Sequence, residues 1–254
     1  LNFSHIKSMD SFVGTDGLKA MLKITYDWMR ERGLDIFCQP VPIACFAHAI
    51  NGGLRINENA ETTLPRLFAA GEVAGGPHGA DRLGGTMLAG SQVFGRRAGK
   101  ASAAAIGHKS VSATLLRWER DKVDEIVGII SDIRGRTEGA YAEQLINEIQ
   151  KTMSLNTLVC RSEESLTKAA EDVAYLRGVF TEDICVGPGH NVVDAMNVRN
   201  LLDVAEIVIG TSLRRRESRG SHYRTDFPTT DSLCDKVINI TRINDRVEYS
   251  AIKL

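Results

Sequence analysis

The chain has 254 residues, of which 43% are hydrophobic and 25% charged, and its formal net charge is -1. This composition is typical of a globular protein with one large domain or two modest ones, and it excludes extensive disorder. The balanced charge provides neither a basic field for nucleic acid nor a polybasic face for a membrane, and no apolar run is long enough to span a bilayer.

The first part of the chain predicts one helix and several short strands. Apolar residues recur at helical spacing over residues 15–33, where a glycine ends the pattern. Residues 43–49 are apolar and short, as a buried strand would be. Residues 54–56 alternate like the return of a hairpin after the Gly52-Gly53 turn, and residues 67–70 read as a second buried strand.

A glycine-rich loop over residues 71–85 follows, and residues 86–105 then read as a helix of small side chains. Glycine loses much conformational entropy on folding, so a loop with six of them is expensive to order. The start of the helix offers free backbone N–H groups and the positive end of the helix dipole. These groups, which attract negative charge, belong to Thr86, Met87 and Leu88.

Three side chains could converge on this loop. Glu72 directly follows the predicted strand, where a carboxylate can bind sugar-like hydroxyls, and Arg82 lies just before the helix, where its fork can bind a carboxylate through two hydrogen bonds. His48 ends the other predicted strand. Each residue alone is more commonly structural or a surface charge, but the order strand, glutamate, glycine loop, arginine, helix is much less common than its parts.

The second half of the chain predicts a bundle-like domain. Helical spacing covers residues 112–131, 137–153, 162–180 and 193–216, and Ser162 is a candidate N-cap before an acidic first turn. The tail alternates apolar and polar residues over 237–252, which predicts a hairpin turning at Asn244-Asp245.

Five cysteines form an odd set without a C-x-x-C pair, which disfavours a disulfide framework, a zinc site or an iron–sulfur cluster held by this chain alone. No metal site is therefore expected, and a reducing cytoplasm is the expected location. The chain begins with Leu and has no signal-peptide layout. It is expected either to be processed or to be part of a longer protein. The cysteines are Cys38, Cys45, Cys160, Cys185 and Cys234.

Four segments together resemble the fumarate reductase/succinate dehydrogenase flavoprotein family. Residues 67–86 read LFAAGEVAGGPHGADRLGGT and residues 93–99 read VFGRRAG, close to the family signature. Residues 48–53 (HAINGG) resemble its His-x-Thr-Met-Gly-Gly segment. Residues 216–226 (RESRGSHYRTD) resemble its Glu-Ser-Arg-Gly-x-His-x-Arg-x-Asp motif.

The resemblance implies an FAD-dependent oxidoreductase of electron transport that transfers a hydride between flavin N5 and a small carboxylate substrate like succinate or fumarate. Ala70, Gly71 and Glu72 would meet the ribityl part of FAD. Gly85, Thr86, Met87 and Leu88 would face the flavin ring with backbone N–H groups. His48 and Arg82 would be catalytic and bind the substrate carboxylate.

The resemblance also implies a mixed fold. A remnant of the substrate-capping domain (residues 1–44) would precede the C-terminal part of an α/β FAD-binding domain (45–108). An all-α C-terminal domain (109–226) and a tail with a β-hairpin (227–254) would follow.

The chain contains no Gly-x-Gly-x-x-Gly turn for the ADP part of FAD. The missing N-terminal FAD-binding half or subunit is therefore an expected partner, with an iron–sulfur electron-transfer subunit as a further one. Such a partner subunit would place the protein at the periphery of a membrane. The rival interpretation is a non-catalytic fragment or subunit whose helical domain binds a partner.

Two departures from the family pattern bear on the substrate. Ile50 and Asn51 stand where the family has Thr-Met, and Asp81 stands where it has Asn before the arginine. Both differences predict a substrate that is larger or less charged than fumarate. The five arginines within residues 214–224 also permit phosphate or RNA binding, but docking of the helical domain is the favoured interpretation.

Overall fold

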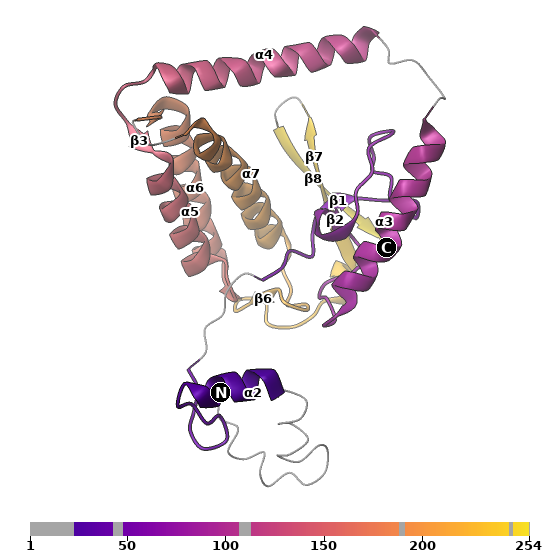
Figure 1. Ribbon diagram of the computed structural model, residues 1–254, viewed down its shortest axis with the longest axis vertical. Coiled ribbons are helices and arrows are strands. Elements are labelled where there is room, and N and C mark those ends of the chain that lie inside the picture. Colours follow the sequence, from indigo (N-terminus) through magenta and orange to yellow (C-terminus); the bar gives the residue numbers. More distant parts are fainter. Residues whose placement is uncertain (1–22, 43–47, 107–112, 188–190, 244–245, 254) are drawn as a thin grey trace. The chain divides into compact units, whose positions relative to one another are not determined.

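The computed structural model describes residues 23–42, 48–106, 113–187, 191–243 and 246–253 (Figure 1). The chain divides into two compact units, Leu1–Phe46 and Ala47–Leu254. The fold combines helices with short two-stranded sheets. The helices are α2 (Lys23–Glu31), α3 (Thr86–Ala105), α4 (Ala113–Gly135), α5 (Ala142–Asn156), α6 (Glu163–Glu182) and α7 (Val192–Arg214), with 3-10 turns η2 (Gly71–Val73) and η3 (Ser232–Cys234).

The strands are short except in the tail. They are β1 (Leu54–Arg55), β2 (Ala74–Gly75), β3 (Ala140–Tyr141), β4 (Cys160–Arg161), β5 (Ile184–Cys185), β6 (Tyr223–Arg224), β7 (Lys236–Ile243) and β8 (Arg246–Lys253). Three parallel pairs, β1–β2, β3–β5 and β4–β6, tie distant segments together, and β7 pairs with β8 antiparallel. No helix among the described residues is both long and apolar enough to cross a membrane.

The first unit is built around α2. Tyr26, Ile36 and Phe37 are buried together, and the rings of Tyr26 and Phe37 lie 5.5 Å apart between centroids. Gly33 has a φ of +78° and donates its N–H to the Arg30 carbonyl at 3.0 Å, so it ends the helix as the sequence predicts. The part of the predicted helix before Lys23 lies outside the described residues.

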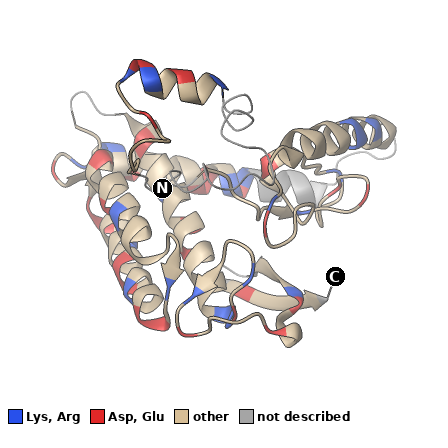
Figure 2. Ribbon diagram, turned by 90° about the horizontal axis from the view of Figure 1, so that it is seen from below, with Lys and Arg blue, Asp and Glu red and all other residues tan. Residues whose placement is uncertain are grey.

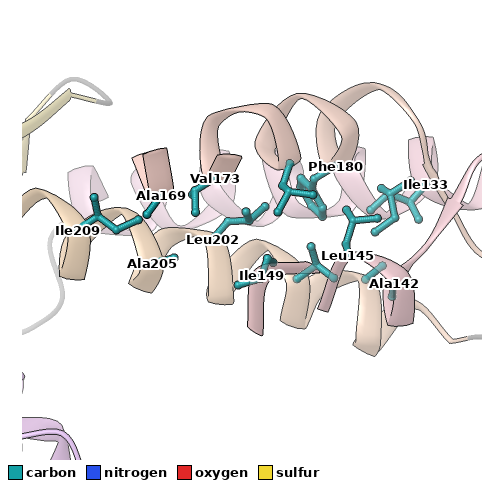
Figure 3. Packing of buried hydrophobic residues seen from close by; sticks show 14 residues of the cluster. Ile133, Ala142, Leu145, Ile149, Ala169, Val173, Phe180, Leu202, Ala205 and Ile209 are labelled. Atoms are coloured by element: carbon teal, nitrogen blue, oxygen red, sulfur yellow. The ribbon is translucent and has the colours of Figure 1, made fainter. Parts of the chain in front are cut away.

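The core of the second unit lies between α5, α6 and α7 (Figure 3). Buried residues recur at alternating spacings of three and four along α6 and α7, which gives each helix one continuous apolar stripe. Figure 3 shows side chains such as Ile149, Val173 and Leu202 filling the space between the helices. The helices predicted over residues 162–180 and 193–216 are confirmed by α6 and α7. The helix predicted over 137–153 is confirmed only from Ala142 on, because Ala140–Tyr141 form β3.

Helix caps follow the predicted chemistry. The Ser162 hydroxyl accepts the Ser165 N–H at 3.1 Å, and the Ser165 hydroxyl accepts the Ser162 N–H at 3.0 Å. Glu163 and Glu164 lie at the positive end of α6. The predicted tail hairpin is present as β7 and β8, although Asn244 and Asp245 lie outside the described residues. Tyr249 of β8 packs on Gly210 of α7, and the Arg214 guanidinium lies 3.5 Å from its ring centroid.

Two strand predictions were wrong. Residues 67–70 are extended but form only the isolated bridge Glu61↔Phe68 in the described structure, and Leu67 is exposed. Residues 54–55 form β1, which pairs in parallel with β2 instead of returning as a hairpin. The backbone that pairs with β1 lies about twenty residues further along the chain, whereas the backbone of residues 67–70 bonds, among the described residues, only to the loop just before it. Residues 43–47 of the other predicted strand lie outside the described residues.

Candidate functional site

The pairing of β1 with β2 brings the His48 segment beside the glycine-rich loop. Leu54 lies opposite Ala74, and Arg55 lies opposite Gly75. A Cβ on Gly53 would collide with the Val73 carbonyl oxygen, so only glycine fits there. Two segments that are about twenty residues apart in sequence therefore run side by side with their backbones in contact.

Glu72 links these two segments directly. Its carboxylate Oε1 accepts the backbone N–H of Ile50 at 2.8 Å, two residues after His48. Both His48 and Glu72 are exposed, and so is the Ile50 side chain at 57%. A carboxylate has further acceptor positions, so Glu72 can hold the Ile50 backbone and still accept a hydroxyl from a ligand.

The start of α3 packs against η2. A Cβ on Gly71 would lie 3.4 Å from the Ser91 hydroxyl, and the backbone of Gly71 has a φ of +80°, which favours glycine. Gly85 is the N-cap of α3 with a φ of +85° and gives no side-chain cap to the helix. Predicted cofactor residues on η2 and on the first turn of α3 thus lie on neighbouring elements.

One predicted donor has a partner inside the protein. The Thr86 N–H is bonded to the Leu83 carbonyl at 3.2 Å, and the Thr86 hydroxyl donates to the same oxygen at 2.7 Å. Met87 and Leu88 follow in the first turn, where a helix has no internal acceptor for its N–H groups. These two residues are therefore the better donors toward a ligand.

Arg82 is half-buried in the loop before α3. The Asp81 carboxylate accepts the Arg82 backbone N–H at 2.8 Å. No hydrogen bond or ion pair joins Arg82 to His48 in the described part of the chain. The structure thus brings the His48 segment beside η2, which carries Gly71 and Glu72, and η2 beside α3, with Arg82 on the connecting loop.

A second polar cluster, the Glu217 cluster, lies in the segment with five arginines. Glu217 is fully buried and accepts hydrogen bonds from Arg215 at 2.7 Å and from Arg219 at 2.9 Å, and also from the Asp231 N–H. Burial by itself would raise the pKa of the Glu217 carboxyl, but these three donors outweigh it and lower that pKa to about 2.

Arg224 and His222 extend this cluster. Arg224 is also fully buried, and it binds the Asp226 carboxylate with two parallel hydrogen bonds of 2.6 and 2.7 Å. These bonds hold the pKa of Asp226 well below its usual range. His222 Nδ1 lies 2.7 Å from Arg161 Nη1 and, since arginine cannot accept, it is the acceptor. Burial, with Arg161, Arg215 and Arg224 nearby, lowers the pKa of His222.

The sequence singled out this segment only as a charged helix end. Its arginines are mostly neutralised within the protein, which leaves little free positive charge for phosphate. Figure 2 shows positive and negative residues interspersed along most of the helices. The signal was present in the spacing: arginine and carboxylate alternate at two-residue intervals in Arg215, Glu217, Arg219 and in Arg224, Asp226.

The residues around α3 fit FAD chemically. Glycines at positive φ open the backbone, the helix start is uncapped, and a carboxylate stands beside it. The side-chain oxygen of Asn51 is buried without a hydrogen-bond partner in the described structure, which leaves one acceptor available beside the His48 segment. No group of three His, Cys, Asp or Glu among the described residues could hold a metal ion.

Family models and known proteins agree on what the chain resembles. The model described as "Fumarate reductase flavoprotein C-term" matches residues 146–252, and the model described as "FAD binding domain" matches residues 5–88. The chain is 39% identical over 201 residues to one subunit of the fumarate reductase (CoM/CoB) of Methanothermobacter marburgensis, covering 78% of the chain and 36% of that protein. It is 33% identical over 210 residues to chloroplastic L-aspartate oxidase of Arabidopsis thaliana, covering 78% and 31%.

A solved structure extends the likeness to the fold. A mutant of E. coli quinol fumarate reductase FrdA matches with a TM-score of 0.77 at 27% identity, covering 95% of the chain and 43% of that structure. The chain thus spans between about a third and less than half of the length of these relatives. The chain belongs to the fumarate reductase/succinate dehydrogenase family of flavoproteins, and its cofactor is FAD.

Proposed function

We propose that this chain is the part of an FAD-dependent oxidoreductase that binds a carboxylate-bearing substrate and places it against the flavin. The observation that carries the proposal is the hydrogen bond of 2.8 Å from the Ile50 N–H to Glu72. Together with the β1–β2 pairing, it holds the His48 segment beside η2, which itself contacts α3. FAD supplies the hydride chemistry when it is bound.

Each site residue has a role that its chemistry can perform. Ala70 and Gly71 leave room for the ribityl chain, and Glu72 accepts its hydroxyls. The N–H groups at the start of α3, from Met87 and Leu88, stabilise negative charge on the flavin ring. His48 and Arg82 bind the substrate carboxylate, and the planar fork of Arg82 fixes its orientation.

The domain organisation follows from the same proposal. Residues 1–44 belong to the substrate-capping domain and residues 45–108 to the FAD-binding domain. Residues 109–226 form the helical domain and residues 227–254 the tail. A second segment or subunit carries the ADP-binding half, and an iron–sulfur subunit passes electrons at the periphery of a membrane.

The substrate is larger or less charged than fumarate. The Ile50 side chain is 57% exposed, so it faces outward in the described structure instead of filling a core. It lacks the hydroxyl that a Thr would offer, and one neutral donor contributes about 0.5–1.5 kcal/mol. The Asp81 carboxylate accepts the Arg82 backbone N–H, and its negative charge next to Arg82 disfavours a dianion at the guanidinium.

The names of the relatives favour the same class without choosing a member of it. One is a fumarate reductase and another an L-aspartate oxidase. The first substrate is a dianion, whereas L-aspartate carries an additional ammonium group and therefore less net charge. Both carry carboxylates that an arginine can bind.

The proposal is tested by reaction rates of the flavin in the complete flavoprotein. Its flavin is reduced, and the rate of reoxidation is measured with fumarate and with monoethyl fumarate. The oxidised enzyme is mixed with L-aspartate in parallel. We expect monoethyl fumarate or L-aspartate to react faster than fumarate. Fumarate as the fastest oxidant would overturn the substrate assignment alone. Failure of every carboxylate would favour the rival function, a non-catalytic subunit that binds a partner through its helical domain.

A further inference from the structure

The Glu217 cluster touches the loop that carries Arg82. Gly220 has a φ of +58°, and a Cβ built on it would lie 2.7 Å from the Ala80 carbonyl oxygen and 2.9 Å from the Asp81 Cβ. Both distances are shorter than real Cβ contacts. Gly220 is thus required twice, once for its backbone conformation and once for the space it leaves.

The loop on the other side of this contact has little support of its own. Among the described residues its hydrogen bonds are local: the Gly79 N–H donates to the Gly76 carbonyl at 3.2 Å, and the Arg82 N–H donates to the Asp81 carboxylate at 2.8 Å. Gly79 adopts a φ of +62°, and further glycines follow at positions 84 and 85. A chain with this much backbone freedom does not fix the position of an arginine by itself.

The turn that carries Gly220 is, in contrast, strongly braced. Arg219 and His222 exchange backbone hydrogen bonds of 2.8 and 3.1 Å across the turn. The Arg219 side chain is held by the buried Glu217 carboxylate. His222 is held by Arg161, at the end of the strand that pairs with β6.

We propose that the turn Ser218–His222 is a positioning element for the substrate arginine, with Gly220 as the contact that sets the Ala80–Asp81 backbone and thereby Arg82. This inference rests on the proposed function of Arg82. A guanidinium can bind a carboxylate with two parallel hydrogen bonds only when its plane is correctly placed. A displacement of about 1 Å costs on the order of a hundredfold in rate at such a site.

The test compares three variants of the complete FAD-loaded protein. Gly220→Ala adds a Cβ against Ala80. Gly220→Asn adds the same atom but tolerates a positive φ, so it separates crowding from backbone strain. Gly178→Ala is the control, because Gly178 lies in α6 with nothing within 4 Å of an added Cβ.

Binding of the redox-inert dicarboxylate malonate is followed by the flavin absorbance, together with KM and kcat for the fastest substrate. We expect both Gly220 variants to weaken malonate binding and raise KM at least about tenfold. Flavin content and the reduction of the flavin by dithionite should stay unchanged. A general structural defect would lower both. The control should match the wild type.

The outcomes separate this inference from the function beneath it. If Gly220→Ala does not fold, the positioning role is judged from Gly220→Asn. Wild-type malonate affinity in a folded, flavin-loaded Gly220 variant would overturn the positioning role and leave the function intact. A wild-type enzyme that neither binds malonate nor reacts with any carboxylate would overturn both.

Discussion

The region from α5 to α7 and the region from His48 to Ala105 are built in opposite ways. In the helical region, α5, α6 and α7 bury their apolar stripes against one another, and in the segment that follows α7 even the charged residues Glu217 and Arg224 are enclosed and paired. In the other region, the 20-residue helix α3 has no buried residue, and glycines replace side chains where the backbones meet. The first region is self-sufficient in packing, whereas the second presents its backbone and polar groups, as a ligand-binding surface does.

Truncation of one leucine in each region tests this contrast. Leu202 of α7 is fully buried, whereas Leu88 of α3 is 70% exposed. Leu202→Ala should lower the free energy of unfolding by about 3–4 kcal/mol through lost burial and a cavity. Leu88→Ala should change it by less than about 0.5 kcal/mol. Denaturant unfolding followed by far-UV circular dichroism measures both, and equal losses would contradict the contrast.

Glu217→Gln tests whether the buried ion cluster stabilises the helical region. Removing the carboxylate leaves Arg215 without its counter-ion and Arg219 with only the exposed Asp235 at 3.5 Å in the described structure. Because both arginines are partly exposed, we expect a loss of about 2–3 kcal/mol for the cluster as a whole. The exposed Glu148 offers a matched control as Glu148→Gln. A loss no larger than that of the control would mean that the cluster contributes no stability.

The pH dependence of the stability of Glu217→Gln shows in which direction the Glu217 carboxylate acts. The pKa of Glu217 falls from 4.5 to about 2 on folding, so its contribution is complete above about pH 4.5 and disappears as the pH falls toward 2. The wild type should therefore lose stability across this window more steeply than Glu217→Gln. Parallel acid-denaturation curves would contradict the assignment.

A smaller effect is expected from His222. Its pKa is lowered in the folded state, so the unfolded chain binds the proton more readily below its ordinary pKa of 6.5. Stability is then complete above that pH and decreases on acidification, as an imidazolium would face Arg161. His222→Gln keeps an acceptor and a donor but cannot titrate. Its melting temperature should fall less than that of the wild type between about pH 7 and pH 5.

The sequence predicted the elements whose signals are local. Residues 86–105 were expected as a helix and form α3 with the same ends. The Ser162 cap and the Gly33 stop also depend on neighbouring residues only. The hairpin at 54–56 failed because β1 pairs with β2, about twenty residues away. The strand at 67–70 failed because, within the described part of the chain, it gains only one isolated bridge, to Glu61.

In the candidate site, too, features with a local signal could be predicted and contacts between distant segments could not. Glu72 and the start of α3 could be singled out from residue types, but the bond from Ile50 to Glu72 spans 22 positions and is visible only in the structure. The burial of Glu217 and the approach of Gly220 to Ala80 were likewise beyond the sequence, because both result from packing between distant segments. The roles of His48 and Arg82 stay predictions.

The most direct test of the proposed function is the rate of flavin reoxidation by a carboxylate substrate in the complete protein, wild type against Arg82→Lys. Lysine keeps the charge but loses the planar fork, so kcat/KM should fall at least about a hundredfold, or roughly 3 kcal/mol, with normal flavin content. Arg134→Lys, a change at the exposed end of α4, should leave the rate unchanged. Turnover at the wild-type rate in Arg82→Lys would contradict the assignment of Arg82 to the substrate carboxylate.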